Sequence, residues 1–356
     1  MKRGVNVLDL FCGAGGLSTG FSKAGFNVLL GIDSNQRAIE TFTSNHISSQ
    51  AICGDMTLIT TQEIINKIGN EEIDVIIGGP PCQGFSMAGK RRPNDPRNSL
   101  FMEYFRLVKE IRPKVFVMEN VKGLLSMKND KGEKVIEIIL NEFRRLEDYI
   151  VNLYEVNTAD YGVPQRRKRI FIIGTKRNYS FLFPTPTHAK EPTGNLNKWM
   201  GIRNIIIDKD KVPKEYFYSK KLIRGFLRRE RENKKRGVGF GWQINNLDNP
   251  SYTLSARYWK DGAESLIKYS PKRIRMLTPE ECAAVQSFPK EYQFKGSKRE
   301  VYTQIGNAVP PLMAEKIAQS IKDCLTEPNI MDYLVSLIGI GVQRKELLST
   351  RVVTTD

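Results

Sequence analysis

Short runs of aliphatic and β-branched residues alternate with helical patterns from the N-terminus to about residue 175. Segments 99–112 and 134–146 carry apolar residues at three- and four-residue spacing, which is typical of amphipathic helices packed on a sheet. The strand-like runs are VNVLDLF, FNVLLGID, AICGD, DVIIGGPP, KVFVMEN and RIFIIG. This alternation predicts an α/β domain with a mostly parallel sheet and crossover helices.

The regular alternation ends after Gly174. Proline and glycine become more frequent there, and a strongly basic stretch occupies 220–237. A helical pattern resumes at 310–325, after QIGNAV. We therefore expect a first domain at 1–180, a smaller irregular domain at 181–300, a segment at 301–325 that returns to the first domain, and a tail at 326–356 of unknown role.

Composition narrows the class of protein without deciding its function. The 356 residues are 40% hydrophobic, enough for a substantial core, and no run reaches the roughly 18 apolar residues of a membrane span. The N-terminus lacks the pattern of a cleavable signal peptide, and five dispersed cysteines fit no disulfide framework. We expect a cytoplasmic protein with no membrane contact.

Charge and histidine content restrict partners and chemistry. A formal net charge of +16 favours a polyanionic partner, because neutralised phosphates release counterions, although a lysine-rich surface explains the charge equally well. Only two histidines and no Cys-x-x-Cys pair occur, so we expect no metal site. The same scarcity disfavours hydrolases that depend on a catalytic histidine.

The segment DLFCGAGGLS (9–18) places glycines where a strand turns into a helix, so the backbone can approach a ligand closely. Gly13 and Gly15 have the spacing of a dinucleotide fingerprint, but Ser18 stands where the third glycine usually lies. A tight turn without a ligand would look the same. Asp33 favours the ligand, because a carboxylate at the end of the next strand can accept hydrogen bonds from both ribose hydroxyls.

Three further reactive residues, Asp55, Cys82 and Glu119, follow or end predicted strands. Ligands of open α/β sheets bind outside the carboxyl ends of the strands, so we expect these residues along one edge. Each alone could be a helix cap, a small buried side chain or half of an ion pair; together they indicate a site. The two prolines in GGPPCQGFS (78–86) restrict the backbone and present the Cys82 sulfur.

Seven motifs follow one another in a characteristic order: DLFCGAGGLS, GDMT (54–57), GGPPCQGFS, MENVKGL (118–124), QRRKRI (165–170), RMLTPEECAAVQSFP (275–289) and QIGNAVPP (304–311). This series resembles the DNA cytosine-5 methyltransferases of prokaryotic restriction-modification systems. The resemblance implies a Rossmann-like S-adenosylmethionine-dependent methyltransferase fold with a target-recognition domain and hinge at 181–300. It also implies a nucleoid-associated monomer that binds double-stranded DNA, with or without a companion restriction endonuclease.

The resemblance assigns catalytic roles to four residues. Cys82 would add to C6 of cytosine as a covalent nucleophile, and Glu119 would contact N3 and the amino group of the base. Arg167 and Arg169 would hold the pyrimidine O2 and orient Glu119. A cytosine stacked in a duplex cannot reach Cys82, so it must be flipped out. The sequence identifies no base for removal of the C5 proton.

For the cofactor, the resemblance implies that Phe11 packs against the methyl donor beside the glycine loop. Asp33 would bind the ribose, Asp55 the adenine amino group, and Asn307 would lie near the methionine part. Ala308 replaces a serine found in many relatives, so one polar contact would be absent.

For DNA, the candidates are Ser86 and Arg97, in a loop similar to the family's mobile loop, and the Thr-Leu pair Thr253 and Leu254. The basic stretch at 220–237 is equally well explained as phosphate-contacting or as solvated.

Three other functions remain open: a transfer RNA cytosine-5 methyltransferase of the same family, a catalytically silent DNA-binding relative, and a nicotinamide dehydrogenase. The long middle region and the GFS after PCQ favour DNA over transfer RNA. The intact candidate catalytic residues disfavour a silent relative, and a dehydrogenase does not explain PPCQGFS.

Overall fold

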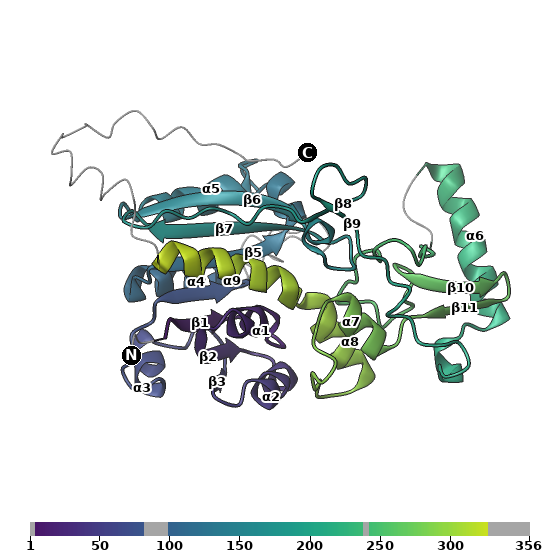
Figure 1. The fold of residues 1–356 in the computed structure, drawn as a ribbon, viewed down its shortest axis with the longest axis horizontal. Helices are drawn as coiled ribbons and strands as arrows, with labels where there is room; N and C mark the ends of the chain where they lie inside the picture. The colour runs from purple at the N-terminus through teal and green to yellow at the C-terminus, as the bar shows by residue number, and fades with distance from the viewer. Residues whose placement is uncertain (1–3, 82–98, 238–241, 327–356) are drawn as a thin grey trace. The chain divides into compact units, whose positions relative to one another are not determined.

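The computed structural model describes residues 4–81, 99–237 and 242–326. The chain divides into two compact units (Figure 1): unit 1 comprises Met1–Val156, Lys168–Thr185 and Ala314–Asp356, and unit 2 comprises Asn157–Arg167 and Pro186–Met313. Two details differ from the expected boundaries. The segment Asn157–Arg167 belongs with unit 2, and the chain returns to unit 1 at Ala314 rather than at 301.

Unit 1 is built on a seven-stranded sheet in the order β3-β2-β1-β4-β5-β7-β6. β1 to β5 run parallel, and β7 is antiparallel to β5. The strands are β1 (Asn6–Leu10), β2 (Asn27–Asp33), β3 (Gln50–Cys53), β4 (Val75–Gly78), β5 (Val115–Val121), β6 (Tyr149–Asn157) and β7 (Lys168–Lys176). The predicted α/β class is confirmed, and the strand order reverses between β1 and β4, where open sheets bind ligands.

Helices cover both faces of this sheet. On one face α3 (Thr61–Lys67), α4 (Ser99–Ile111) and α5 (Val135–Arg144) pack their apolar side chains on the strands. Burial of each large side chain contributes about 1.5–3 kcal/mol. On the other face lie α1 (Gly16–Lys23), α2 (Gln36–Asn45) and α9 (Pro311–Thr326). Phe42 of α2 packs on β2 so closely that a Cβ on Gly31 would lie 2.5 Å from its ring.

Unit 2 has little regular structure, as the loss of alternation predicts. Its core gathers aromatic and aliphatic side chains from loops and short elements. These elements are η4 (Thr158–Tyr161), β8 (His188–Ala189), β9 (Asn197–Lys198), η5 (Lys214–Tyr216), α6 (Lys220–Arg236), β10 (Leu266–Ser270), β11 (Arg273–Met276), α7 (Pro279–Val285) and α8 (Lys298–Asn307). In the described parts of both units, no helix is long and apolar enough to cross a bilayer.

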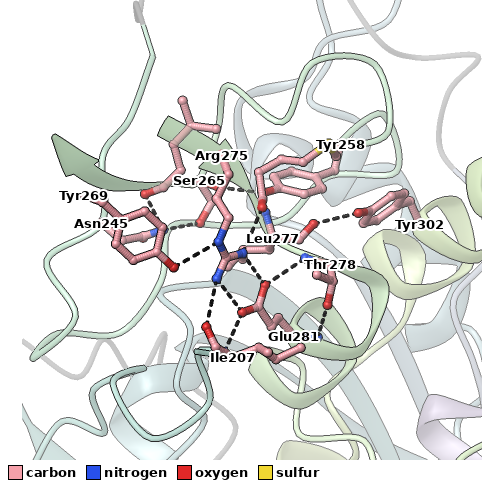
Figure 2. A network of polar contacts seen from close by, with 12 residues as sticks. Ile207, Asn245, Tyr258, Ser265, Tyr269, Arg275, Leu277, Thr278, Glu281 and Tyr302 are labelled. Carbon is pink, nitrogen blue, oxygen red and sulfur yellow. Dashed lines mark hydrogen bonds and ion pairs between the residues drawn. The ribbon is translucent and has the colours of Figure 1, made fainter. Parts of the chain in front are cut away.

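A buried ion pair organises the unit 2 core (Figure 2). Arg275 of β11 donates to both carboxylate oxygens of Glu281, at 2.6 and 2.7 Å, and both side chains are 0% exposed. Burial alone would lower the pKa of Arg275, but the hydrogen bonds and charge of Glu281 outweigh it and raise the pKa. Glu281 also accepts from the backbone N–H groups of Ile207 and Thr278. The pair therefore joins β11, α7 and the loop that contains Ile207, called the 207 loop below.

Candidate active site

The end of β4 passes very close to its neighbours. A Cβ on Gly78 would lie 2.3 Å from the Leu10 carbonyl oxygen, so no larger residue fits there. A Cβ on Gly79 would lie 3.2 Å from Glu119 Oε2, which is tighter than nearly all real contacts. Because both residues are glycines, the backbone that follows β4 can pass close to the Glu119 carboxylate.

Glu119 and Arg169 form a buried ion pair at the same edge of the sheet. Arg169 pairs with Val121 across β5 and β7, which makes Arg169 a diagonal neighbour of Glu119. Glu119 Oε1 lies 2.9 Å from Arg169 Nε, with the side chains 10% and 12% exposed.

The geometry of this pair leaves hydrogen-bonding capacity unused. Neither Glu119 Oε1 nor Arg169 Nε makes an aligned hydrogen bond to any described residue, so the contact is electrostatic. Burial lowers the pKa of Arg169, and the charge of Glu119 opposes this. A buried acceptor beside a buried donor suits a planar ligand that can satisfy both.

Asn120, for which the sequence pattern suggests no role, fixes the chain that leads to Cys82. Its Nδ2 donates to the Pro80 carbonyl oxygen at 3.0 Å, and the residue is 6% exposed. The bond ties β5 to the segment two residues before Cys82. The sequence signals for Asn120 are its place in the motif MENVKGL and its polar side chain beside Glu119, directly after the apolar run VFVM.

Three predicted site residues lie outside the described residues: Cys82, Ser86 and Arg97. The described chain reaches Pro81 on one side of them and resumes at Ser99 on the other.

The loop after β1 contains three backbone conformations of the left-handed region. Phe11, Gly13 and Gly15 have φ values of 58°, 54° and 83°. Glycine adopts this region freely, but Phe11 stores strain of about 1–3 kcal/mol, and such strain is often found at ligand sites. A Cβ on Gly13 would meet no atom within 4 Å, so the space beside this backbone is open.

The Asp33 carboxylate holds this loop in place. Its Oδ2 accepts from Gly13 N at 2.9 Å, and its Oδ1 accepts from Asn35 N at 2.8 Å. Burial raises the pKa of Asp33, and these backbone hydrogen bonds oppose the shift. Each oxygen keeps a further lone pair for a ligand.

Asp55 lies two residues beyond β3, the strand that pairs with β2. Its Oδ1 accepts from the backbone N–H and the hydroxyl of Thr57, at 3.0 and 2.8 Å, and these bonds lower the pKa of Asp55. Its Oδ2 has no partner among the residues that the structure describes. Asp33 and Asp55 thus follow neighbouring parallel strands, as expected.

Beneath the glycine loop lies a carboxylate that motif reasoning missed. Asp9 is 0% exposed, and its Oδ2 accepts from the Ser18 hydroxyl at 2.6 Å. Burial raises the pKa of Asp9 to about 7, although the Ser18 bond opposes this. Ser18, at the position of a fingerprint glycine, therefore supplies a hydrogen bond to one oxygen of Asp9, while Asp9 Oδ1 has no partner among the described residues. The available signal was a carboxylate inside the apolar run VNVLDLF.

Arg167 binds the backbone of unit 2. Its side chain is 1% exposed, and its guanidinium donates to the carbonyl oxygens of Leu254, Gly306 and Asn307 at 3.1, 2.9 and 3.5 Å. The expected role was to hold the pyrimidine O2 together with Arg169. Instead, these contacts join Arg167 to the Thr-Leu pair and to the exposed Asn307 at the end of α8.

Thr253 and Leu254 also bond to their own unit. The Thr253 hydroxyl donates to the Arg166 carbonyl oxygen at 2.6 Å, and Leu254 N donates to Gln165 Oε1 at 3.0 Å. Gln165 in turn donates to Gln286 Oε1 at 2.8 Å. These two glutamines lie inside quoted motifs, but no local pattern reveals that residues so far apart in the chain meet.

Comparison with known proteins gives a consistent result. The family model for C-5 cytosine-specific DNA methylases matches residues 5–323. The chain is 38% identical to the type II methyltransferase M1.ScrFI of Lactococcus lactis subsp. cremoris over 90% of this chain and 78% of that protein. It is 36% identical to the type II methyltransferase M1.HphI of Haemophilus parahaemolyticus over 89% of this chain and 86% of that protein.

Solved structures share the fold. One is a prophage-encoded E. coli protein assigned as a DNA modification methyltransferase, with a TM-score of 0.68 and 26% identity over 91% of this chain and all of that chain. Another is the S. pombe Dnmt2 methyltransferase, with a TM-score of 0.71 over the same shares. At 17% identity, the second shows the fold alone.

Proposed function

The chain belongs to the C-5 cytosine-specific DNA methylase family, and on this basis we propose that it methylates C5 of a cytosine flipped out of a specific duplex sequence, with Cys82 as the covalent nucleophile. It is a DNA cytosine-5 methyltransferase of the type II restriction-modification kind. The mechanism, the cofactor contacts and the recognition residues are our proposals.

The observation that supports this mechanism best is the buried Glu119–Arg169 pair beside Gly79. A cytosine ring presents N3 and an amino group along one edge and O2 next to N3. We assign O2 to Arg169, whose Nε–H has no aligned acceptor, and the amino group to Glu119, whose Oε1 has no aligned donor. Glu119 would also donate a proton to N3, which is itself an acceptor. Gly79 and the Asn120–Pro80 bond hold the described chain that precedes Cys82 beside β5, the strand that bears Glu119.

The proposed reaction begins when the Cys82 thiolate forms a bond to C6 and the electrons of the C5–C6 double bond shift to form a C4–C5 double bond. Glu119 delivers a proton to N3 in this step, so the ring becomes a neutral enamine with a nucleophilic C5. The same proton returns to Glu119 when C5 takes up the methyl group and the ring is restored. After C5 has been methylated, its proton leaves to a base and the C6–S bond breaks. The ring double bond is restored and the thiolate is regenerated.

The glycine loop and its carboxylates fit S-adenosylmethionine, which supplies the methyl group when bound. Asp33 has free lone pairs for the ribose hydroxyls, Asp55 has a free oxygen for the adenine amino group, and open space adjoins Gly13. Phe11 would pack against the cofactor from its strained position. Asn307 remains our candidate for the methionine part.

We assign target recognition to the region 181–300, which lies largely in unit 2. We propose an indirect role in recognition for Arg167, Thr253 and Leu254. Their polar groups bond within unit 2 and would hold its backbone in the conformation that contacts DNA. Ser86 and Arg97 remain candidates for direct DNA contact. We further propose that the protein is a monomer associated with the nucleoid. A companion restriction endonuclease would act separately from it, without a stable complex.

Bisulfite sequencing of DNA from cells that express the protein tests the function. We expect one short sequence in which the same cytosine resists conversion at nearly every occurrence. Full conversion of all cytosines, together with methylated transfer RNA, would favour the transfer RNA alternative. Full conversion in both nucleic acids would favour a silent relative.

A further inference from the structure

A stripe of basic side chains runs along one side of α6. It consists of Lys221, Arg224, Arg228, Arg231 and Lys235, which follow one another at spacings of three and four residues. This spacing keeps residues on one face of an α-helix. From the first to the last, the stripe is about 21 Å long at a rise of 1.5 Å per residue.

The stripe lies opposite the side by which α6 is attached. Ile223 and Phe226 are the buried residues of the helix, at 5% and 2% exposure. The Trp242 ring stacks on Phe226 at 5.6 Å, and its Nε1 donates to Glu230 at 3.2 Å. All five stripe residues are exposed. The attachment therefore fixes the helix to unit 2 and turns the stripe to solvent.

Acidic residues nearby do not neutralise the stripe. Glu232 lies 3.8 Å from Arg228, while Glu230 bonds to the indole. The other four members, Lys221, Arg224, Arg231 and Lys235, have no acidic partner in the part of the chain that the structure describes. Like charges three and four residues apart destabilise a helix by about 0.2–0.5 kcal/mol per pair. A polyanion along the stripe would remove this repulsion.

Gly225 leaves the surface of α6 without a side chain between two members of the stripe. A glycine inside a helix costs about 1 kcal/mol relative to alanine. Packing does not require it here, because a Cβ on Gly225 would meet no atom within 4 Å. Gly225 lies beside Lys221 and Arg228 on the helix surface, so a phosphate can approach closely between them.

We propose that the α6 stripe, which lies within the region 181–300, is a sequence-independent contact for the phosphates of duplex DNA. This inference rests on the proposed function and deepens it. The linear row of cations matches the linear phosphate backbone, and each neutralised phosphate releases counterions. The stripe raises affinity for any duplex and thereby holds the enzyme on DNA while it searches for its site.

The test compares two full-length variants with equal loss of charge. The stripe variant carries Lys221→Gln, Arg224→Gln, Arg231→Gln and Lys235→Gln, and glutamine preserves helix propensity. The control variant carries Lys109→Gln, Lys128→Gln, Lys131→Gln and Lys134→Gln, four exposed unit 1 residues. Binding to a fluorescent duplex of random sequence is measured by anisotropy over a series of salt concentrations.

We expect the log–log salt slope of the stripe variant to be shallower than that of the wild type by up to about 3.6, at 0.9 per lost phosphate contact. The control should keep the wild-type slope and should methylate saturating DNA at low salt at the wild-type rate. Equal slopes in the two variants would overturn the proposal. Absence of methyl transfer by the wild type would instead overturn the proposed function.

Discussion

At the scale of single residues, the site depends on carboxylates whose environments differ greatly. Asp55 is exposed, and hydrogen bonds from Thr57 lower its pKa. Burial raises the pKa of Asp33, and it raises that of Asp9 to about 7. Asp55 and Asp33 offer oxygens to a ligand, whereas Asp9 lies below the glycine loop and bonds to Ser18. We therefore expect a change at Asp33 to alter cofactor affinity and a change at Asp9 to alter the pH dependence of stability.

Replacing Asp33 should affect the cofactor and not DNA. Asp33→Ala removes an acceptor for the ribose and the support of Gly13 N. Because hydrogen bonds to a charged group contribute about 1.5–3 kcal/mol, we expect S-adenosylmethionine affinity to fall about 10- to 100-fold. Calorimetry with the cofactor and anisotropy with duplex DNA check this. Equal losses of both affinities would contradict the assignment.

Asp9 should make stability depend on pH. Its pKa is 3.8 ordinarily and about 7 in the folded protein, so between these values the folded state holds one more proton than the unfolded chain. Stability conferred by the protonated carboxyl is then complete below about pH 4 and is lost as pH rises through about 7. The full effect is on the order of 4 kcal/mol.

The Asp9→Asn variant has no titratable side chain at this position and serves as the control. Urea unfolding from pH 5 to pH 8 should show the wild type losing stability relative to the variant as pH rises. If the two proteins change in parallel over this range, Asp9 does not titrate as proposed.

At the scale of elements, unit 2 depends on polar contacts more than on regular structure. The pair Arg275–Glu281 joins β11, α7 and the 207 loop, while Arg167 joins the Thr-Leu pair to the end of α8. Both arginine side chains are buried. Short elements can keep a defined geometry when buried donors and acceptors are matched in this way.

Breaking the buried pair should destabilise unit 2 strongly. Glu281→Gln leaves the Arg275 charge buried without its counter-ion, and such changes cost about 3–5 kcal/mol. The neighbouring exposed Glu280→Gln is the matched control, with an expected effect within about 0.5 kcal/mol. Denaturant unfolding of both variants decides the matter. A similar stability for the two would show that the pair does not hold the unit together.

At the scale of the whole molecule, the sequence predicts unit 1 better than unit 2. Asp33 ends β2, Asp55 follows β3, and Glu119 lies two residues before the end of β5. Their places near one edge of the sheet follow from local patterns, because parallel strands share one carboxyl edge. Local patterns do not predict the partners of Arg167, because Leu254 and Gly306 are 87 and 139 residues away in the chain. Arg167 and Arg169 look equivalent in QRRKRI, yet the boundary between units falls between them.

The central claim is that Cys82 of this chain methylates C5 of cytosine in duplex DNA. The most direct measurement supplies labelled S-adenosylmethionine and duplex DNA to the wild type and to Cys82→Ser, followed by mass spectrometry of the digested nucleosides. Covalent catalysis by Cys82 predicts labelled 5-methyl-2′-deoxycytidine with the wild type and none with Cys82→Ser, although that variant still binds DNA. Wild-type turnover by Cys82→Ser would contradict it.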